Sequence, residues 1–173
     1  MNLLKPTLIG ALSIAVCLAC GDQQAADQEA VLETISAYLE ALDRADYSAA
    51  HSMLASSIQA RLPHDAYVDA HESLTPPSVK NASPTQITYG APSVSPYRAL
   101  VPVSMSVTAP AVVALVQGMQ QRGPVEGDQR IGKNSIDLDS EYELIREESG
   151  WRVVLNEGAV ALEEQAIANA NGG

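Results

Sequence analysis

The sequence predicts an α+β fold in which N-terminal helices pack on one face of an antiparallel sheet. Between positions 27 and 74, apolar residues recur every three or four positions, which is the spacing of amphipathic helices. After Ser83-Pro84 the spacing becomes two, as in strands with one buried face. Because the helices precede the strands instead of alternating with them, a helix layer on an antiparallel sheet is expected.

Three helices are expected in the first half of the chain. Asp27 is a candidate N-cap for the first, whose apolar face consists of Val31, Ile35, Tyr38, Leu39 and Leu42. Asp46 is placed to cap a second helix over 47–61. Pro63 is placed to open a third, which ends before the prolines at 76 and 77.

A long strand is expected next, after a short one at Ile87 and Tyr89. Its apolar positions alternate with polar ones and comprise Tyr97, Ala99, Val101, Val103, Met105 and Val107. Pro102 has no N–H to give to a neighbouring strand, so this strand is expected to lie at an edge of the sheet or to carry a bulge there.

A hairpin is expected near the end of the chain. The apolar residues of its first strand alternate with four carboxylates, Asp137, Asp139, Glu141 and Glu143. Residues 147–150 form a turn of ordinary length, and Trp151 opens the second strand on its apolar face. We predict that Trp151 is buried and that the carboxylates face water. Like charges on that face oppose dimerisation, so a monomer is expected.

The first nineteen residues have the parts of a bacterial lipoprotein export signal. One basic residue, Lys5, precedes an apolar run over 8–19, which is shorter than the ~20 residues that a membrane-spanning helix needs. Leu18-Ala19-Cys20 resembles the lipobox, in which a signal peptidase cuts before a cysteine that carries acyl chains such as palmitate. We therefore expect a signal peptide over 1–19, lipid on Cys20, a tether over 20–26, one domain over 27–157 and an Ala-rich tail over 158–173.

The charge balance limits the partners of the protein. The chain has 10 Lys and Arg against 21 Asp and Glu, for a net charge of −11. Such a surface repels nucleic acid and anionic lipid headgroups, so membrane attachment is expected through the lipid on Cys20. Gly21 stands where an Asp would signal inner-membrane retention in enteric bacteria. The expected location is therefore the cell envelope, with the periplasmic face of the outer membrane favoured.

Two groups of residues carry a family resemblance. The first is Tyr38-Leu39-x-Ala41-Leu42-x-x-x-Asp46-Tyr47-x-x-Ala50, and the second is Tyr142-x-Leu144 with Gly150-Trp151-Arg152-Val153. Together they resemble the nuclear transport factor 2-like superfamily, and more narrowly its bacterial lipoproteins, over residues 27–156. The resemblance implies a strongly curved sheet wrapped around helices as a cone, often with a pocket at the open end.

Three local patterns resemble known sites but lack a required feature. Residues 127–134 differ from a Walker A loop because Asn134 stands where Ser or Thr must hold magnesium. An EF-hand-like run of acids has Tyr142 at the position of the obligatory glycine. His64 and His71 are about 10 Å apart along a helix, too far to share one zinc ion, and are expected to be exposed. We therefore expect no metal and no cofactor.

The candidate pocket residues are His51, Tyr97, Tyr142 and Met119. His51, on the second helix, is either a partly buried core residue or a pocket residue. The resemblance implies that enzymes of this superfamily use pocket carboxylates with Tyr or His for proton transfer. The inward strand positions of this chain offer hydroxyls but no acid, so a base would have to come from His51 or Asp46 on the helices. No catalytic residue is therefore predicted.

The expected function is that of a lipid-anchored binding or interaction module of the cell envelope, without catalysis. Its partner would be an envelope protein or a small apolar ligand. The alternative is a small-molecule enzyme that uses general acid–base chemistry in the cone pocket. Residues 109–122, with apolar positions at helical spacing, are expected to form a helix over the open end, either as a movable lid or as a permanent plug.

Overall fold

The structure of the protein is a computed structural model that describes residues 12–74, 86–108, 128–131 and 135–171. The predicted helix over 109–122, including Met119, lies outside the described residues. The described elements are, in chain order, α1 (Leu12–Asp43), α2 (Tyr47–Ser52), α3 (Ser56–Arg61), α4 (His64–Leu74), β1 (Gln86–Tyr89), β2 (Ser93–Val94), β3 (Arg98–Thr108), β4 (Asp128–Ile131), β5 (Ser135–Glu147), β6 (Gly150–Val154) and α7 (Glu157–Asn171).

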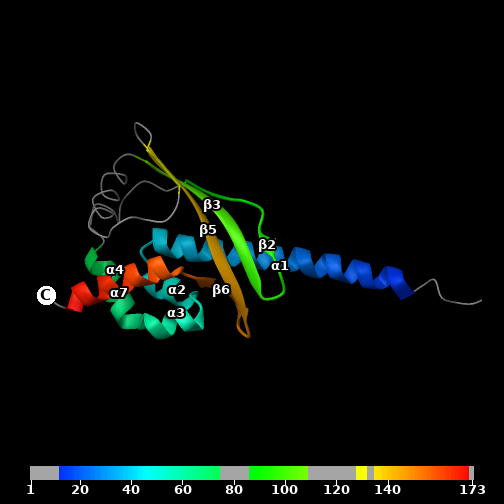
Figure 1. Ribbon diagram of the computed structural model, residues 1–173, viewed down its shortest axis with the longest axis horizontal. Helices are drawn as coiled ribbons and strands as arrows, with labels where there is room; N and C mark the ends of the chain where they lie inside the picture. The colour runs from blue at the N-terminus through cyan, green and yellow to red at the C-terminus, as the bar shows by residue number, and fades with distance from the viewer. Residues whose placement is uncertain (1–11, 75–85, 109–127, 132–134, 172–173) are drawn as a thin grey trace, which may run out of the picture.

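The strands form one antiparallel sheet. Its strand order is β1-β3-β5-β4, with β2 also paired to β3 and β6 also paired to β5. The long strands β3 and β5 pair in unbroken register from Arg98↔Ile145 to Thr108↔Ser135. Figure 1 shows these strands bending over the helices, with α1 running across the sheet. The predicted α+β class, with N-terminal helices packed on a curved antiparallel sheet, is confirmed.

One face of the sheet covers the core. Alternate residues of β3 and β5 point inward, so Ala99, Val101 and Leu144 are buried against the helices. The helical spacing of α1 correctly predicted that Val31, Ile35, Tyr38 and Leu39 are buried, whereas Leu42, predicted with them, is only partly buried and Ala41 beside it is buried. Trp151 of β6 is 6% exposed, which confirms its predicted burial. The core therefore lies between the sheet and the helices.

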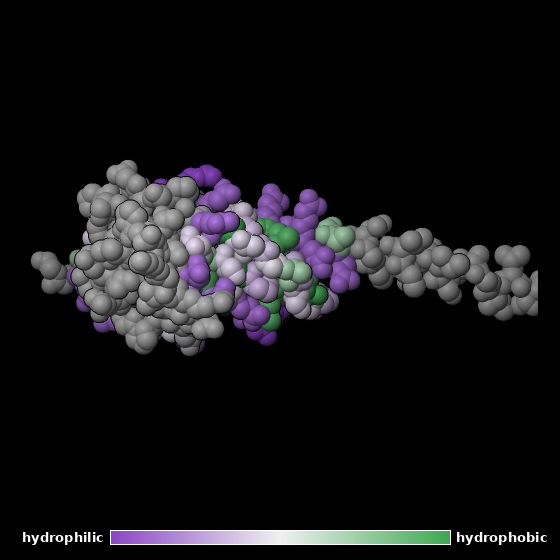
Figure 2. All heavy atoms as spheres, turned by 90° about the horizontal axis from the view of Figure 1, so that it is seen from above, coloured by the Kyte–Doolittle hydropathy of each residue, from purple (hydrophilic) through white to green (hydrophobic). Residues whose placement is uncertain are grey.

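The opposite face of the sheet is polar. Ser104 Oγ donates to the Asp139 carboxylate at 2.6 Å, and Ser106 Oγ donates to that of Asp137 at 2.7 Å. Figure 2, which looks down on the molecule, shows polar side chains over much of the described surface, interrupted by small apolar patches. The carboxylates of β5 thus lie on the face away from the core, as their alternation predicted.

Pro102 does not mark an edge strand or a bulge, because β3 is central in the sheet and pairs with β5 in unbroken register. On one side of β3, Pro102 lies opposite Glu141 of β5. On the other side, β1 pairs with β3 as far as Val103 and β2 pairs with it from Leu100, so Pro102 lies between the two paired stretches. Its carbonyl accepts a hydrogen bond from Gly90 N at 2.8 Å on that side. The missing N–H therefore falls at a break between two strands, where the sheet requires no donor.

The predicted helix over 47–61 is two helices in the structure. The chain leaves the helical path at Met53, and Leu54 forms a parallel bridge with Val153 of β6. Ala55 N donates to the Val153 carbonyl at 2.8 Å, and Val153 N donates to the Met53 carbonyl at 2.9 Å. These bonds pair the outer edge of β6, which would otherwise be open. Helical spacing could not reveal the break, because it depends on a strand about a hundred residues away.

The described N-terminal part is helical. Helix α1 continues without a break through residues 20–26, the predicted tether. Alanine and glutamine, which predominate there, are strong helix formers and account for the difference. Figure 1 shows the first turns of α1 projecting beyond the sheet. Among the helices of the described part, none is both long enough and apolar enough to cross a membrane.

The C-terminal segment is a docked helix. Helix α7 lies almost entirely within the predicted Ala-rich tail and packs against α4. Arg61 of α3 forms ion pairs with two residues in the first half of α7, Glu157 at 2.8 Å and Glu164 at 3.0 Å. This segment is therefore part of the domain, which corrects the domain boundary expected at residue 157.

Candidate functional site

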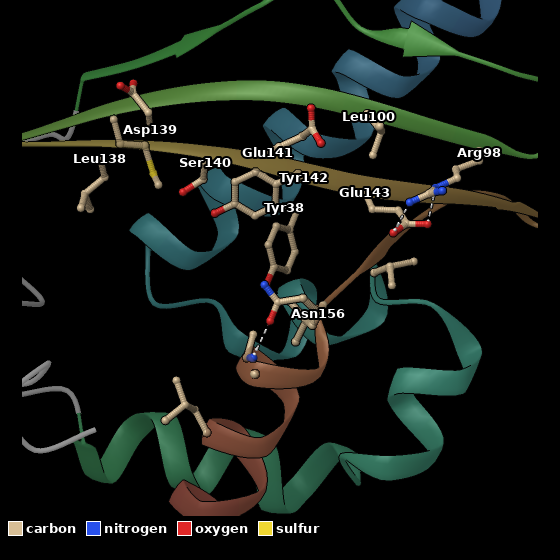
Figure 3. Close-up of a pocket in the computed structure, with 16 residues that line it drawn as sticks. Tyr38, Arg98, Leu100, Leu138, Asp139, Ser140, Glu141, Tyr142, Glu143 and Asn156 are labelled. Carbon is tan, nitrogen blue, oxygen red and sulfur yellow. Dashed lines mark hydrogen bonds and ion pairs between the residues drawn. The ribbon is translucent and has the colours of Figure 1, made fainter. Parts of the chain in front are cut away.

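A cavity of about 810 Å³ lies beside the middle of β5. That volume is within the range of small-molecule sites. Its wall comes from β3, β5, the end of β6, the start of α7 and Tyr38 of α1. Figure 3 shows Ser140 and Tyr142 pointing from β5 to the side on which Tyr38 lies, while the hydroxyl end of Tyr38 points toward Asn156. The cavity is thus bounded by the inner face of the sheet and by the junction of β6 with α7.

Tyrosine hydroxyls line the inner part of the cavity. Burial raises the pKa of Tyr38 well above its usual value, and the neighbouring Tyr67, Tyr142 and Glu163 act in the same direction. Burial, and then the nearby Tyr89, also raise the pKa of Tyr142. Both cavity tyrosines therefore stay protonated at neutral pH. Tyr142 is suited to donate a hydrogen bond to a ligand, and neither tyrosine is suited to act as a base.

In the rest of the wall, apolar and charged side chains lie in different places. Its apolar part includes Met105, Leu138, Leu155 and Leu162. Arg98 and Glu143 form an ion pair at 2.6 Å at one end. Asp139 and Glu141 also border the cavity, but Figure 3 shows their side chains on the opposite side of β5 from Tyr142. The carboxylates therefore surround the mouth and leave the interior to hydroxyl and aliphatic groups.

The structure brings one of the predicted pocket residues to this cavity. Tyr142 lies in its wall, as predicted. Tyr97, by contrast, is 78% exposed, so its predicted inward orientation is wrong. The strand alternation does not extend to it, because β3 begins only after Tyr97. Met119 and the side chain of Cys20 lie outside the described residues.

His51 is a core residue in the structure and is not among the residues that line the cavity. Only 6% of its surface is exposed, and its Nε2 donates to the carbonyl of Leu62 at 2.6 Å. Its ring lies 5.2 Å from that of His64 and 5.3 Å from that of Tyr67, measured between centroids. These contacts hold His51 of α2 against α4, so of the two predicted alternatives His51 is the core residue and not the pocket residue.

His71 also differs from the prediction, because it is not an exposed helix residue. Its ring stacks on Tyr47 at 4.7 Å and contacts Tyr67 at 4.4 Å between centroids. Its Nε2 lies 3.0 Å from the carboxylate of Glu163 on α7. These contacts join five rings into what we call the aromatic cluster: Tyr47, His51, His64, Tyr67 and His71. Within the described ranges, no group of three His, Cys, Asp or Glu residues is placed to hold a metal ion.

Sequence reasoning missed Tyr38 and Asn156 as cavity residues. Tyr38 was correctly assigned to the buried face of the first helix, but helical spacing does not show that it also borders a cavity. Asn156 Oδ1 accepts a hydrogen bond from Ala159 N at 2.7 Å at the start of α7. An Asn at such a position is a recognised N-cap signal, and it would have indicated the helix that brings it to the cavity.

No family model and no curated protein matches the chain. One similar solved structure is a proposed dehydratase of the nuclear transport factor 2-like family from Streptomyces avermitilis, at 18% identity over 75% of this chain and 92% of that chain, with a TM-score of 0.44. Another is a nuclear transport factor 2-like protein with a cystatin-like fold from Novosphingobium aromaticivorans, at 14% identity over 93% and 98% of the two chains, with a TM-score of 0.40. The solved structures similar to this chain thus include nuclear transport factor 2-like proteins.

Proposed function

We propose that this chain is a lipid-anchored binding module of the bacterial cell envelope, of the nuclear transport factor 2-like type, that acts without catalysis. The division of the cavity wall carries this proposal, because hydroxyl and aliphatic groups line the interior while carboxylates surround the mouth. Such an interior can hold an apolar ligand and orient it by a hydrogen bond from Tyr142. The ligand is a small apolar molecule or an apolar group of an envelope protein.

The positions of the histidines support binding over the alternative of acid–base catalysis. His51 is held by the carbonyl of Leu62, and His71 by the carboxylate of Glu163. Neither belongs to the cavity wall as far as the structure describes it. An enzyme in this cavity would need its base from the mouth, since the two cavity tyrosines are held in their protonated form.

The proposed anchor is a lipid on Cys20, at the periplasmic face of the outer membrane. Six residues of helix lie between Cys20 and Asp27, and the rise along the axis from one to the other is about 10 Å. Asp27 is tied to the sheet by an ion pair with Arg146 at 2.9 Å. A monomeric domain would therefore stand close to the bilayer on a short helical spacer.

Cell fractionation of a Cys20→Ser variant tests the anchor. We expect this variant to be soluble or to keep its signal peptide uncleaved, because the acidic domain has no attraction for an anionic membrane. Cys17→Ser is the matched control and should remain processed and anchored. Mature-sized Cys20→Ser protein in membranes after a high-salt wash would contradict the proposed anchor.

Titration of the purified full chain with the neutral apolar dye Nile red tests the cavity. Leu162→Glu places a carboxylate in the apolar wall, so we expect at least about a tenfold loss of dye affinity, from the cost of burying an unpaired charge. Ala161→Glu adds the same charge to the exposed face of α7 and should change nothing. Equal affinities in the two variants would contradict the assignment of the site.

A further inference from the structure

A serine, a histidine and a carboxylate are hydrogen-bonded in series where α2 meets the start of α4. Ser48 Oγ lies 2.9 Å from Nε2 of His64, and Nδ1 of the same ring lies 2.8 Å from Oδ1 of Asp65. Ser48 belongs to α2, whereas the other two are the first residues of α4, which packs against α2. The three groups are therefore connected as in a Ser–His–Asp triad, in which each ring nitrogen meets one partner.

The two hydrogen bonds determine which ring nitrogen of His64 carries the proton. An ionised carboxylate can only accept hydrogen bonds, so Asp65 keeps the proton of the neutral ring on Nδ1. Nε2 is then without a proton and accepts from the hydroxyl of Ser48. In this form the ring can take the hydroxyl proton, as a general base must do to activate a serine.

Neighbouring residues hold the serine and the ring in place. The side chain of Asp46 caps α2 by accepting from Ala49 N at 3.0 Å, which fixes the turn that carries Ser48. The buried ring of His51 meets that of His64 edge-on, at 5.2 Å between centroids and 86° between planes. The ring of His64 is therefore held at both nitrogens and against a residue of the core.

A small molecule can reach this serine. Ser48 is exposed, and 48% of the side chain of His64 is exposed. Ser52, the last residue of α2, is also exposed, but its hydroxyl donates to the carbonyl of Ala49 at 2.7 Å. The same short helix thus carries one serine bonded to an imidazole and one bonded to a backbone carbonyl, which makes Ser52 a matched control.

We propose that Ser48 is a modification site that takes an acyl group from a small activated ester. Ser48 Oγ attacks the ester carbonyl carbon and forms a C–O bond, while its proton passes to Nε2 of His64. The bond to the leaving oxygen then breaks, and that oxygen takes the bonding electron pair and the proton from Nε2. Asp65 is a positioning residue, because it acts through the ring.

This inference goes beyond the proposed binding function. Ser48, His64 and Asp65 are not among the residues of the cavity wall, as far as the structure describes it. Transfer of one acyl group to one serine modifies the chain and needs no turnover. Nile red should therefore bind Ser48→Ala as it binds the wild type, so that the two proposals are tested separately.

Incubation of the purified full chain with p-nitrophenyl acetate tests the inference. Trypsin cuts after Arg44 and Arg61, so one peptide contains both Ser48 and Ser52, and its fragmentation in a mass spectrometer measures acetylation at each. We expect Ser48 to be acetylated about a hundredfold faster than Ser52, which is the effect of a general base. His64→Gln should remove this difference, and circular dichroism shows whether that variant is folded.

Asp65→Asn tests the positioning role. An amide can donate to Nδ1 as well as accept from it, so the variant should acetylate Ser48 more slowly and lose part of the Nδ1–H form of His64. Nitrogen-15 NMR of the ring measures that form. Asp69→Asn removes a charge from an exposed position of the same helix and should change neither quantity.

Equal rates of acetylation at Ser48 and Ser52 in the wild type would overturn the inference, and this comparison does not depend on the folding of any variant. An unchanged rate at Ser48 in folded His64→Gln would also overturn it, because the hydrogen bond between these residues would then only join α2 to α4.

Discussion

The aromatic cluster and the cavity both contain tyrosines, but these are enclosed by other side chains in the cluster and face open space on one side in the cavity. In the cluster, Tyr67 is buried between the rings of His51 and His71, and Glu163 closes the group from α7. In the cavity, Tyr142 is only partly buried and faces open space. Titratable residues therefore indicate a binding site only where the packing leaves one side of them accessible.

The two regions meet at a hydrogen bond between Tyr38 and Tyr67. Tyr38 belongs to the cavity wall, whereas Tyr67 belongs to the aromatic cluster. The cluster, whose residues belong to α2 and α4, thus lies directly behind the cavity wall at Tyr38. Mutations in the cluster should act mainly on stability, and mutations in the cavity mainly on binding.

The largest expected effect comes from truncating a tyrosine of the cluster. Tyr67 is 1% exposed, so Tyr67→Ala should lower the free energy of unfolding by about 3–5 kcal/mol, because it leaves a cavity among packed rings. Tyr142→Ala removes a ring that already borders open space and should cost less than half as much. Urea denaturation of the two variants measures the difference. Equal losses of stability would mean that the cavity wall is packed like the core.

The pH dependence of stability gives the next comparison. The pKa of Tyr38 is raised by burial, so its contribution to stability is complete below the unfolded-state pKa of ~10 and is lost as pH rises through the higher folded-state pKa. Tyr38→Phe cannot ionise. The stability advantage of the wild type over this variant should therefore shrink between pH ~9 and ~11. Thermal unfolding across this range measures it, and a constant difference would show that Tyr38 is not desolvated.

The smallest effect is expected at a hydrogen-bonded carboxylate outside both regions, which serves as a baseline. Ser56 donates to Glu147 through N at 2.8 Å and through Oγ at 2.6 Å, and these bonds lower the pKa of the carboxyl group. Their contribution to stability is present above the unfolded-state pKa of ~4.3 and is lost as pH falls through the lower folded-state pKa. Ser56→Ala should cost less than about 1 kcal/mol near neutral pH, because water screens this exposed pair, and the cost should disappear in acid. If Ser56→Ala lost the same stability in acid, the loss would come from the changed first residue of α3 and not from the bond to Glu147.

The sequence predicted residues well where a single element decides their environment. Ile35 and Tyr38 are buried because they share the apolar face of α1, and Trp151 is buried because it shares that of β6. Tyr97 was wrongly placed because alternation says nothing about where a strand begins. The break at Met53 was missed because it is stabilised by bonds to Val153, which no local pattern contains.

The sequence by itself determined the fold class, the inward faces of the helices and long strands, and the acidic outer face of β5, because each follows from a local period of apolar residues. Only the tertiary structure decided which of these residues meet. His71 contacts Glu163 because α7 docks on α4. Helix docking and strand register join residues far apart in the chain, and so the cavity and the meeting of its tyrosines have no signature in any short segment of the sequence.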